Sequence, residues 1–294
     1  LQRVGSTAKL RPVEHDGDKP TPAGINPHSV ETMQSYWRPF QIAFVLASLP
    51  KIVDPDHPGR SNVDVIWMPT GGGKTEAYLG LAAFTILWER RQETLNGEQC
   101  RRATMRVLMR YTLRLLTVQQ FLRSAALVCA LERIREAAPD RYGIGEVRIG
   151  AWVGKSTTDN KRDHALRRLK QAVATSTDAG FLLTQCPWCG AQMGHPVGGE
   201  IAGYRAVARP GGGKRVRVSC PDTTCDFAFR EIRIGDLTLE RGLPVLEVDE
   251  DVYEFPPDFV IGTIDKVAMM WDQTKAQRLF GIKNCKRING SRPP

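Results

Sequence analysis

The sequence lacks both a long hydrophobic run and an apolar N-terminal segment. Nowhere in its 294 residues do apolar side chains continue for the ~20 positions that a membrane-spanning helix needs. The opening residues, from Leu1 to Gly5, do not form the apolar core of a secretory signal peptide. These absences argue against membrane-spanning and secreted proteins, and we expect a cytoplasmic protein without a membrane partner.

Acidic residues are outnumbered as well. The chain has 32 Asp and Glu against 41 Lys and Arg, so its formal net charge is +9. This surplus favours an anionic partner, with nucleic acid the first candidate, although an ordinary basic surface would also account for it. The content of 41% hydrophobic and 25% charged residues is typical of a globular chain with one large or two modest domains.

Cysteine is scarce, and four of the seven cysteines are paired along the sequence. Two residues separate Cys186 from Cys189, and four separate Cys220 from Cys225. In a cytoplasmic chain, two such pairs predict a closed, structural Zn²⁺ site rather than disulfides. A disulfide or unligated buried thiols are the alternatives. Cys129 lies on the apolar stripe of an expected helix, so we expect it in the core.

The most informative motif is a glycine-rich loop. An apolar run at residues 63–68 predicts a strand before it, and a helical pattern follows from Ala77, which is the context of a phosphate-binding loop. The glycines would let backbone N–H groups surround the phosphates of ATP, Lys74 would reach the β- and γ-phosphates, and the Thr75 hydroxyl would ligate Mg²⁺. Met68 replaces the first glycine of the general pattern, and a plain glycine turn is the alternative. The expected nucleotide-binding residues are Thr70, Gly71, Gly72, Gly73, Lys74, Thr75 and Glu76.

A second Gly-Gly-Gly-Lys run ends at Lys214. Arg215 stands where a phosphate-binding loop needs Ser or Thr, and no apolar strand precedes the glycines. We therefore expect a hairpin turn between strands at residues 204–209 and 214–218, within an insert that also holds the paired cysteines.

The remaining pattern alternates strands with helices. Expected strands span residues 105–111, 146–153 and 258–263, and expected helices span residues 35–50, 116–134 and 160–174, with a further helix from residue 265. Such an alternation predicts a parallel, layered α/β sheet.

Three segments together resemble superfamily 2 helicases. Residues 68–76 resemble motif I, residues 110–120 occupy the place of motif Ia, and residues 258–266 resemble motif Ib. With the inserted cysteine pairs, they look like the N-terminal part of the helicase subunit of DISARM, a bacterial anti-phage system. The resemblance runs from about residue 35 to residue 281. It implies an α/β fold: an incomplete first helicase domain, built as a P-loop RecA-like parallel sheet, with an inserted zinc-ribbon-like subdomain.

The resemblance also implies roles for single residues. Gln41 stands where such helicases place an adenine-reading glutamine. Thr112, Arg114 and Thr263 would lie near the backbone of a nucleic acid, with DNA the expected form. Surface or capping roles are the alternatives for these residues. A basic helix at residues 161–170 would add a face that follows phosphates, unless it is a solvated helix face.

We expect five consecutive parts. They are a lead-in at residues 1–34, the first part of the RecA-like ATP-binding domain at 35–180, a zinc-binding insert at 181–242, the continuation of the RecA-like domain at 243–281, and an irregular tail at 282–294.

One expected feature, motif II, is missing. Helicases of this kind need an apolar strand ending in Asp-Glu after motif Ib, and residues 282–294 hold no carboxylate. Asp249 and Glu250 follow an apolar run but precede motif Ib. We interpret them as an acidic link that returns to the sheet, with a metal-binding carboxylate pair as the alternative. The sequence thus predicts a truncated helicase that is not a competent ATPase alone.

The functional expectation is the ATP-binding domain of a superfamily 2 DNA helicase or translocase in phage defence, with other subunits of a defence complex as possible partners. The alternative is a zinc-stabilised nucleic-acid-binding or complex-assembly module with a vestigial nucleotide site. A small P-loop phosphotransferase would need a phosphate-acceptor site, for which the sequence has no motif.

Overall fold

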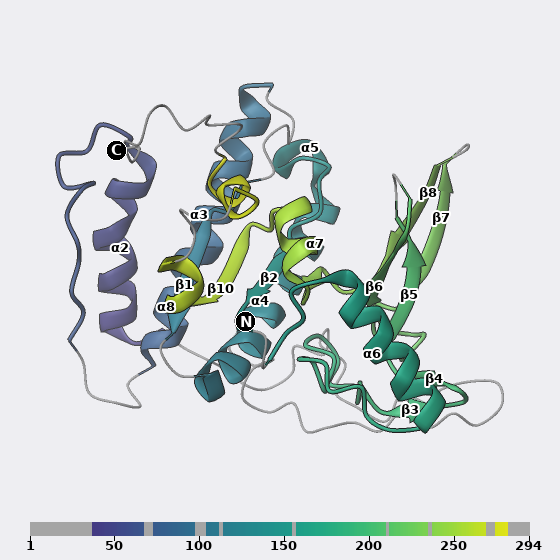
Figure 1. Cartoon of the computed structure of the whole chain (residues 1–294). Helices are drawn as coiled ribbons and strands as arrows, with labels where there is room; N and C mark the ends of the chain where they lie inside the picture. The colour runs from purple at the N-terminus through teal and green to yellow at the C-terminus, as the bar shows by residue number, and fades with distance from the viewer. Residues whose placement is uncertain are drawn as a thin grey trace, which may run out of the picture.

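The computed structural model describes residues 37–67, 73–97, 104–111, 114–154, 157–209, 212–234, 237–268 and 274–281. At its centre lies a four-stranded parallel sheet with the order β1-β10-β2-β9 (Figure 1). Its strands are β1 (Val107–Tyr111), β10 (Phe259–Thr263), β2 (Ile149–Trp152) and β9 (Val245–Leu246). The expected parallel α/β sheet is confirmed for β1, β10 and β2. β9 was not predicted, because the segment that contains it was interpreted as a link to the sheet.

Helices cover both faces of this sheet. The described helices are α2 (Pro39–Val53), α3 (Lys74–Leu95), α4 (Arg114–Ala137), α5 (Pro139–Tyr142), α6 (Arg162–Thr175), α7 (Asp249–Glu254), α8 (Ile264–Ala268) and the 3₁₀ helix η2 (Ala276–Phe280). α3 and α4 pack on one face of the sheet, and α7 and η2 pack on the other. Within the described ranges, none of the helices is both long and apolar enough to cross a membrane.

Side chains of β10 alternate between two cores, as the pleat of a strand requires. Phe259 and Ile261 join a core with residues of α3 and α4. Val260 joins a second core on the opposite face with residues of α7 and η2. A parallel strand that is covered on both faces is apolar at successive positions. This explains why Phe259, Val260 and Ile261 of β10 form an uninterrupted apolar run in the sequence.

Helix α2 packs along α3, outside the sheet layer (Figure 1). Phe44 and Tyr78 meet edge to face, with ring centroids 5.7 Å apart. The helix continues through Pro50 to Val53 instead of ending at Pro50. Pro50 lies in the last turn, where its missing N–H removes one hydrogen bond without stopping the helix.

The strand expected at residues 63–68 is not formed in the described part of that segment. Residues 62–67 belong to no strand there, and Val63, Val65 and Trp67 expose 88%, 87% and 92% of their surfaces. The prediction of a buried strand was wrong. A strand needs a neighbour that pairs with its backbone N–H and C=O groups. No described strand lies against this segment. Met68 is outside the described residues.

The chain between α6 and β9 forms a smaller region of antiparallel strands. They are β3 (Pro196–Val197), β4 (Glu200–Ile201), β5 (Tyr204–Ala208), β6 (Lys214–Val218), β7 (Arg230–Ile234) and β8 (Leu237–Arg241). The hairpin expected at β5 and β6 is confirmed, with Ala208 opposite Lys214. The described end of the second Gly-Gly-Gly-Lys run therefore belongs to this hairpin, in which the Arg209 N–H donates to the Gly213 carbonyl at 3.0 Å.

The hairpin of β7 and β8 was not predicted. Its strands pair over five residues each, from Arg230 opposite Arg241 to Ile234 opposite Leu237. The signal was available, because both segments alternate apolar and polar residues around Gly235-Asp236, a dipeptide typical of tight hairpin turns.

Candidate nucleotide site and metal centre

The helix expected after the glycine-rich loop is present. α3 begins at Lys74, and its N-cap residue, Gly73, has a left-handed backbone with φ of 87°. Glycine suits this conformation because it has no Cβ. Lys74 and Thr75 thus stand in the first turn, where the positive end of the helix dipole favours an anion. The remaining expected loop residues, Thr70, Gly71 and Gly72, lie outside the described residues.

Gln41 is buried against the last glycine of this loop. Its Nε2 donates to the Gly73 carbonyl at 2.7 Å, and its Oε1 accepts from the Arg38 backbone N–H at 2.8 Å. A Cβ at position 73 would lie 2.7 Å from Gln41 Nε2, so any other residue there would displace the Gln41 amide. The amide thus ties α2 to the loop. Its expected role in reading adenine stays a prediction.

Glu76, in the first turn of α3, forms an ion pair with Arg123 of α4. The two side chains expose 22% and 30% of their surfaces. No sequence pattern predicts this pair, because 47 positions separate the two residues and no periodicity relates two different helices. The contact joins the helix after the loop to the helix after β1.

Two segments expected near nucleic acid meet at one edge of the sheet. Tyr111 ends β1, Thr263 ends β10, and the two are paired in register. The carboxyl ends of both strands therefore lie at the same edge of the sheet, which is where open parallel sheets usually bind ligands. Thr263 itself is buried. Arg114 is the first residue of α4, and Thr112 lies outside the described residues.

The carboxylates considered as an alternative motif II are engaged in polar contacts. Lys266 of α8 pairs with Asp249 and donates to Asn160 Oδ1 at 3.2 Å. The Arg162 backbone N–H donates to Glu250 Oε2 at 3.0 Å, and its Nη2 donates to the Glu250 carbonyl at 2.9 Å. These contacts tie α6, α7 and α8 together, and they favour a structural link over a metal-binding pair.

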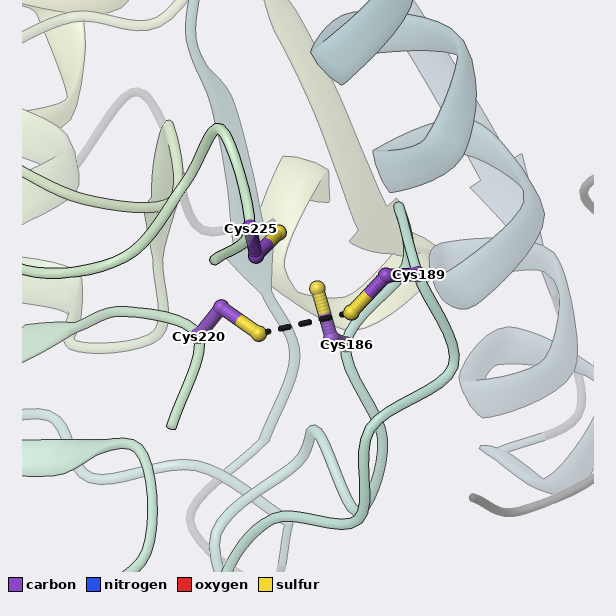
Figure 2. A group of neighbouring side chains, drawn as sticks. All are labelled: Cys186, Cys189, Cys220 and Cys225. Atoms are coloured by element: carbon purple, nitrogen blue, oxygen red, sulfur yellow. Dashed lines mark hydrogen bonds between the residues drawn. The ribbon is translucent and has the colours of Figure 1, made fainter. Parts of the chain in front are cut away.

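The four paired cysteines converge on one point (Figure 2). The sulfur atoms of Cys186, Cys189, Cys220 and Cys225 lie within 4.8 Å of one another, and 3.5 Å separates Cys189 Sγ from Cys220 Sγ. A disulfide would need about 2.05 Å. A tetrahedral Zn²⁺ with Zn–S bonds of about 2.3 Å holds its sulfurs about 3.8 Å apart. The cluster could therefore hold a metal ion, and four thiols suit Zn²⁺.

Local turns bring each cysteine pair together. The Gly190 N–H donates to the Cys186 carbonyl at 2.9 Å, and Gly190 has φ of 80°, a value that favours glycine. In the second pair, Asp222 accepts the Thr224 backbone N–H at 2.9 Å, which fixes the longer loop. Hydrogen bonds from Cys186 and the other two thiols lower the pKa of Cys189, whereas burial raises the pKa of Cys186 well above its ordinary value.

Cys129 stands apart from this chemistry. It is fully buried on α4 and belongs to the main core. Burial raises the pKa of its thiol well above the ordinary value, so it stays protonated. The expectation of a core cysteine is confirmed.

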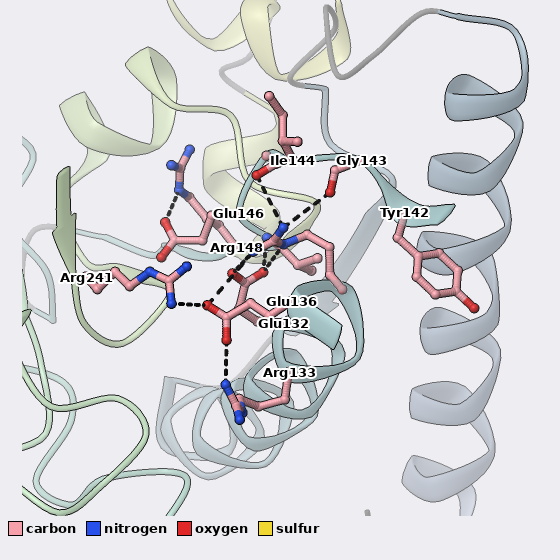
Figure 3. Close-up of polar contacts among 12 residues, drawn as sticks. Glu132, Arg133, Glu136, Tyr142, Gly143, Ile144, Glu146, Arg148 and Arg241 are labelled. Atoms are coloured by element: carbon pink, nitrogen blue, oxygen red, sulfur yellow. Dashed lines mark hydrogen bonds and ion pairs between the residues drawn. The ribbon is translucent and has the colours of Figure 1, made fainter. Parts of the chain in front are cut away.

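Charged contacts fix the cysteine module, which we define as residues 181–242, to the central layer. Arg241 Nη1 of β8 lies 2.9 Å from Glu136 Oε1 of α4 (Figure 3). Arg217 Nη2 of β6 lies 3.1 Å from Glu146 Oε1, just before β2. Burial opposes ionisation of Glu146, but Arg217 and Arg148 lower its pKa to about 2, so the carboxylate is charged at neutral pH. Ion pairs therefore connect the module to α4 and to the residue Glu146, which precedes β2.

The basic helix α6 contains two kinds of cation. Arg162 Nε lies 2.7 Å from Asp251 Oδ1, and Arg168 Nη2 lies 2.7 Å from Asp159 Oδ2, so both arginines are committed to internal ion pairs. The exposed cations on and beside this helix are Lys161, Arg167 and Lys170. Among the described cations of this helix and its N-cap, these three are placed to meet an external anion.

No protein-family model matches this chain. The DISARM protein DrmA of Bacillus paralicheniformis is 34% identical to it over 266 residues. The match takes in 85% of this chain and 22% of that relative, so the chain spans less than a quarter of the relative's length. The resemblance to a DISARM protein, expected from the motifs, is confirmed. Over most of its length, this chain is a relative of DISARM protein DrmA.

Proposed function

We propose that this chain is the ATP-binding part of a superfamily 2 DNA helicase or translocase in phage defence, with an incomplete P-loop RecA-like domain. The start of α3 at Lys74, directly after the left-handed Gly73, carries the proposal. A phosphate there would meet the helix N-terminus and the lysine together. The relation to DISARM protein DrmA supports the setting of phage defence.

We also propose the division of the chain that its sequence suggests. Residues 35–180 and 243–281 would form the nucleotide-binding domain, residues 181–242 the zinc insert, and residues 1–34 and 282–294 the flanks. A closed four-sulfur site has no open position for catalysis, which supports a structural role for Zn²⁺. An ion pair between Arg241 and Glu136 joins the insert to α4. The cytoplasm, with other defence subunits nearby, would be the setting.

At the bound nucleotide, side chains of this protein would position the phosphates and neutralise their charge. Lys74 would contact the β- and γ-phosphates, and Thr75 would ligate the Mg²⁺ that offsets phosphate charge. Phosphoryl transfer also needs a group that orients the attacking water. Asp249 and Glu250 are held by Lys266 and Arg162, so we do not assign them that role. We therefore propose nucleotide binding with little turnover.

The test is titration of the purified chain with a fluorescent ATP analogue and Mg²⁺. Lys74→Ala should abolish binding, because it removes the cation that meets the phosphates. The chain offers a matched control in Lys214→Ala, which alters the other Gly-Gly-Gly-Lys run, in the β5–β6 hairpin, and should leave affinity unchanged. Equal affinity of the wild type and Lys74→Ala would remove the site assignment.

The exposed cations at α6 favour a second candidate, a zinc-stabilised nucleic-acid-binding or assembly module with a vestigial nucleotide site. Its DNA binding would be sensitive to salt, indifferent to ATP and unchanged by Lys74→Ala. The helicase proposal expects instead that bound nucleotide changes DNA affinity. Fluorescence anisotropy of labelled single-stranded DNA, with and without ATP, separates the two.

A further inference from the structure

Glu76 holds its carboxylate beside the last glycine of the phosphate loop. A Cβ at Gly73 would lie 3.4 Å from Glu76 Oε2, so the carboxylate folds back toward the loop instead of pointing along α3. The N-terminus of a helix attracts any anion. This carboxylate is therefore an internal competitor at the position where Lys74 would meet a phosphate.

Arg123 supplies the opposite charge. It reaches from α4 to pair with Glu76, and both side chains are half-buried, so solvent screens the pair only in part. The pair could serve only to brace α3 against α4. Its position beside Gly73 indicates more than that, because a change in its charge would act directly on a phosphate bound at the loop.

We propose that Arg123 is a positioning residue for nucleotide binding. By neutralising and holding Glu76, it keeps the N-terminus of α3 receptive to the phosphates of a nucleotide. This inference rests on the proposed function. It adds a residue from α4, distant in sequence from the glycine-rich loop, to the parts of the chain that set nucleotide affinity.

The experiment compares the affinity of the full chain for a fluorescent ATP analogue with Mg²⁺ in four forms: wild type, Arg123→Ala, Glu76→Gln and the double variant. Arg123→Ala should weaken binding about tenfold, since one unpaired carboxylate then faces the phosphates at a protein surface. The double variant should return to within about twofold of the wild type, because the repelling charge is gone. A mere brace predicts the reverse, with the double variant at least as weak as Arg123→Ala.

A matched control is Arg133→Ala, which removes another α4 arginine that pairs with a glutamate, Glu136, at 2.6 Å. It should leave affinity unchanged. If Arg123→Ala fails to fold, as judged by thermal melting, Glu76→Gln alone decides. Its removal of one negative charge should tighten binding about threefold, and unchanged or weaker binding overturns the inference. A wild type that binds no analogue refutes the proposed function as well, whereas a wild type that binds without regard to Glu76 refutes only the inference.

Discussion

Arg90 and Asp258 form a buried, two-point ion pair between α3 and the start of β10. Arg90 Nε lies 2.9 Å from Asp258 Oδ1, and Arg90 Nη2 lies 3.1 Å from Oδ2. Arg106 also pairs with this carboxylate, and the Arg148 backbone N–H donates to its Oδ2 at 3.2 Å. One carboxylate therefore holds α3, the helix that begins at Lys74, against two neighbouring strands of the sheet.

We expect Asp258→Asn to lower the free energy of unfolding by about 3–5 kcal/mol, because it leaves buried guanidinium groups without a counter-charge. Urea denaturation followed by circular dichroism measures the change. Asp163→Asn, at an exposed position on α6, is the control and should stay within about 0.5 kcal/mol of the wild type. A similar small change for Asp258→Asn would contradict the assigned role.

The Asp258 carboxylate should also make the stability of the protein depend on pH. Burial opposes ionisation of Asp258, but Arg90 and Arg106 lower its pKa below the ordinary 3.8. A carboxyl with a lowered folded pKa stabilises the protein above its unfolded pKa of about 3.9, and this contribution is lost as pH falls toward the folded value. Melting temperatures between pH 3 and pH 7 should fall below about pH 4 more steeply for the wild type than for Asp258→Asn. Parallel curves would refute the linkage.

Metal removal should unfold the cysteine module. Structural Zn²⁺ contributes on the order of 10 kcal/mol in small modules, so Cys220→Ser should lose bound zinc together with the fold of residues 181–242. Atomic absorption gives the metal content, and limited proteolysis reports on the module. Cys129→Ala removes a thiol outside the cluster and should keep its zinc. Full zinc content in Cys220→Ser would exclude the four-cysteine site.

The exposed segment before the phosphate loop can be tested against a buried strand. Val65→Asp should change the free energy of unfolding by no more than about 0.5 kcal/mol, because this side chain is almost fully exposed. Ile261→Ala in β10 removes a fully buried side chain and should cost about 2–5 kcal/mol. Denaturation of both variants gives the comparison. A large loss in Val65→Asp would mean that this segment is buried in solution.

The exposed cations at α6 should contribute to nucleic-acid affinity. Replacing Lys161, Arg167 and Lys170 together by Ala should reduce the slope of log affinity against log salt by up to about 0.7 per lost phosphate contact on single-stranded DNA. The control replaces three exposed cations of the cysteine module, Arg205, Lys214 and Arg230, and changes net charge equally. Equal losses in both variants would indicate a general charge effect rather than a binding face.

Local features of this chain could be read from its sequence. β10 and α4 were expected because apolar periodicity records which residues are buried within one element. The start of α3 and the cysteine pairs were expected because Gly73 and the spacing of Cys186 and Cys189 encode turns between near neighbours. The sequence by itself therefore determined β10, α4, the start of α3 and the local pairing of the cysteines.

Only the tertiary structure decided the strand pairing and the ion pairs, because both depend on residues far apart in the sequence. The run at residues 63–68 has the composition of a strand, yet no described strand pairs with it, because pairing is a property of two segments. The contacts of Glu76 with Arg123 and of Arg90 with Asp258 likewise join residues 47 and 168 positions apart. Ionic contacts between elements carry no periodic signal, so only the packing of α3 on α4 and on the sheet could establish them.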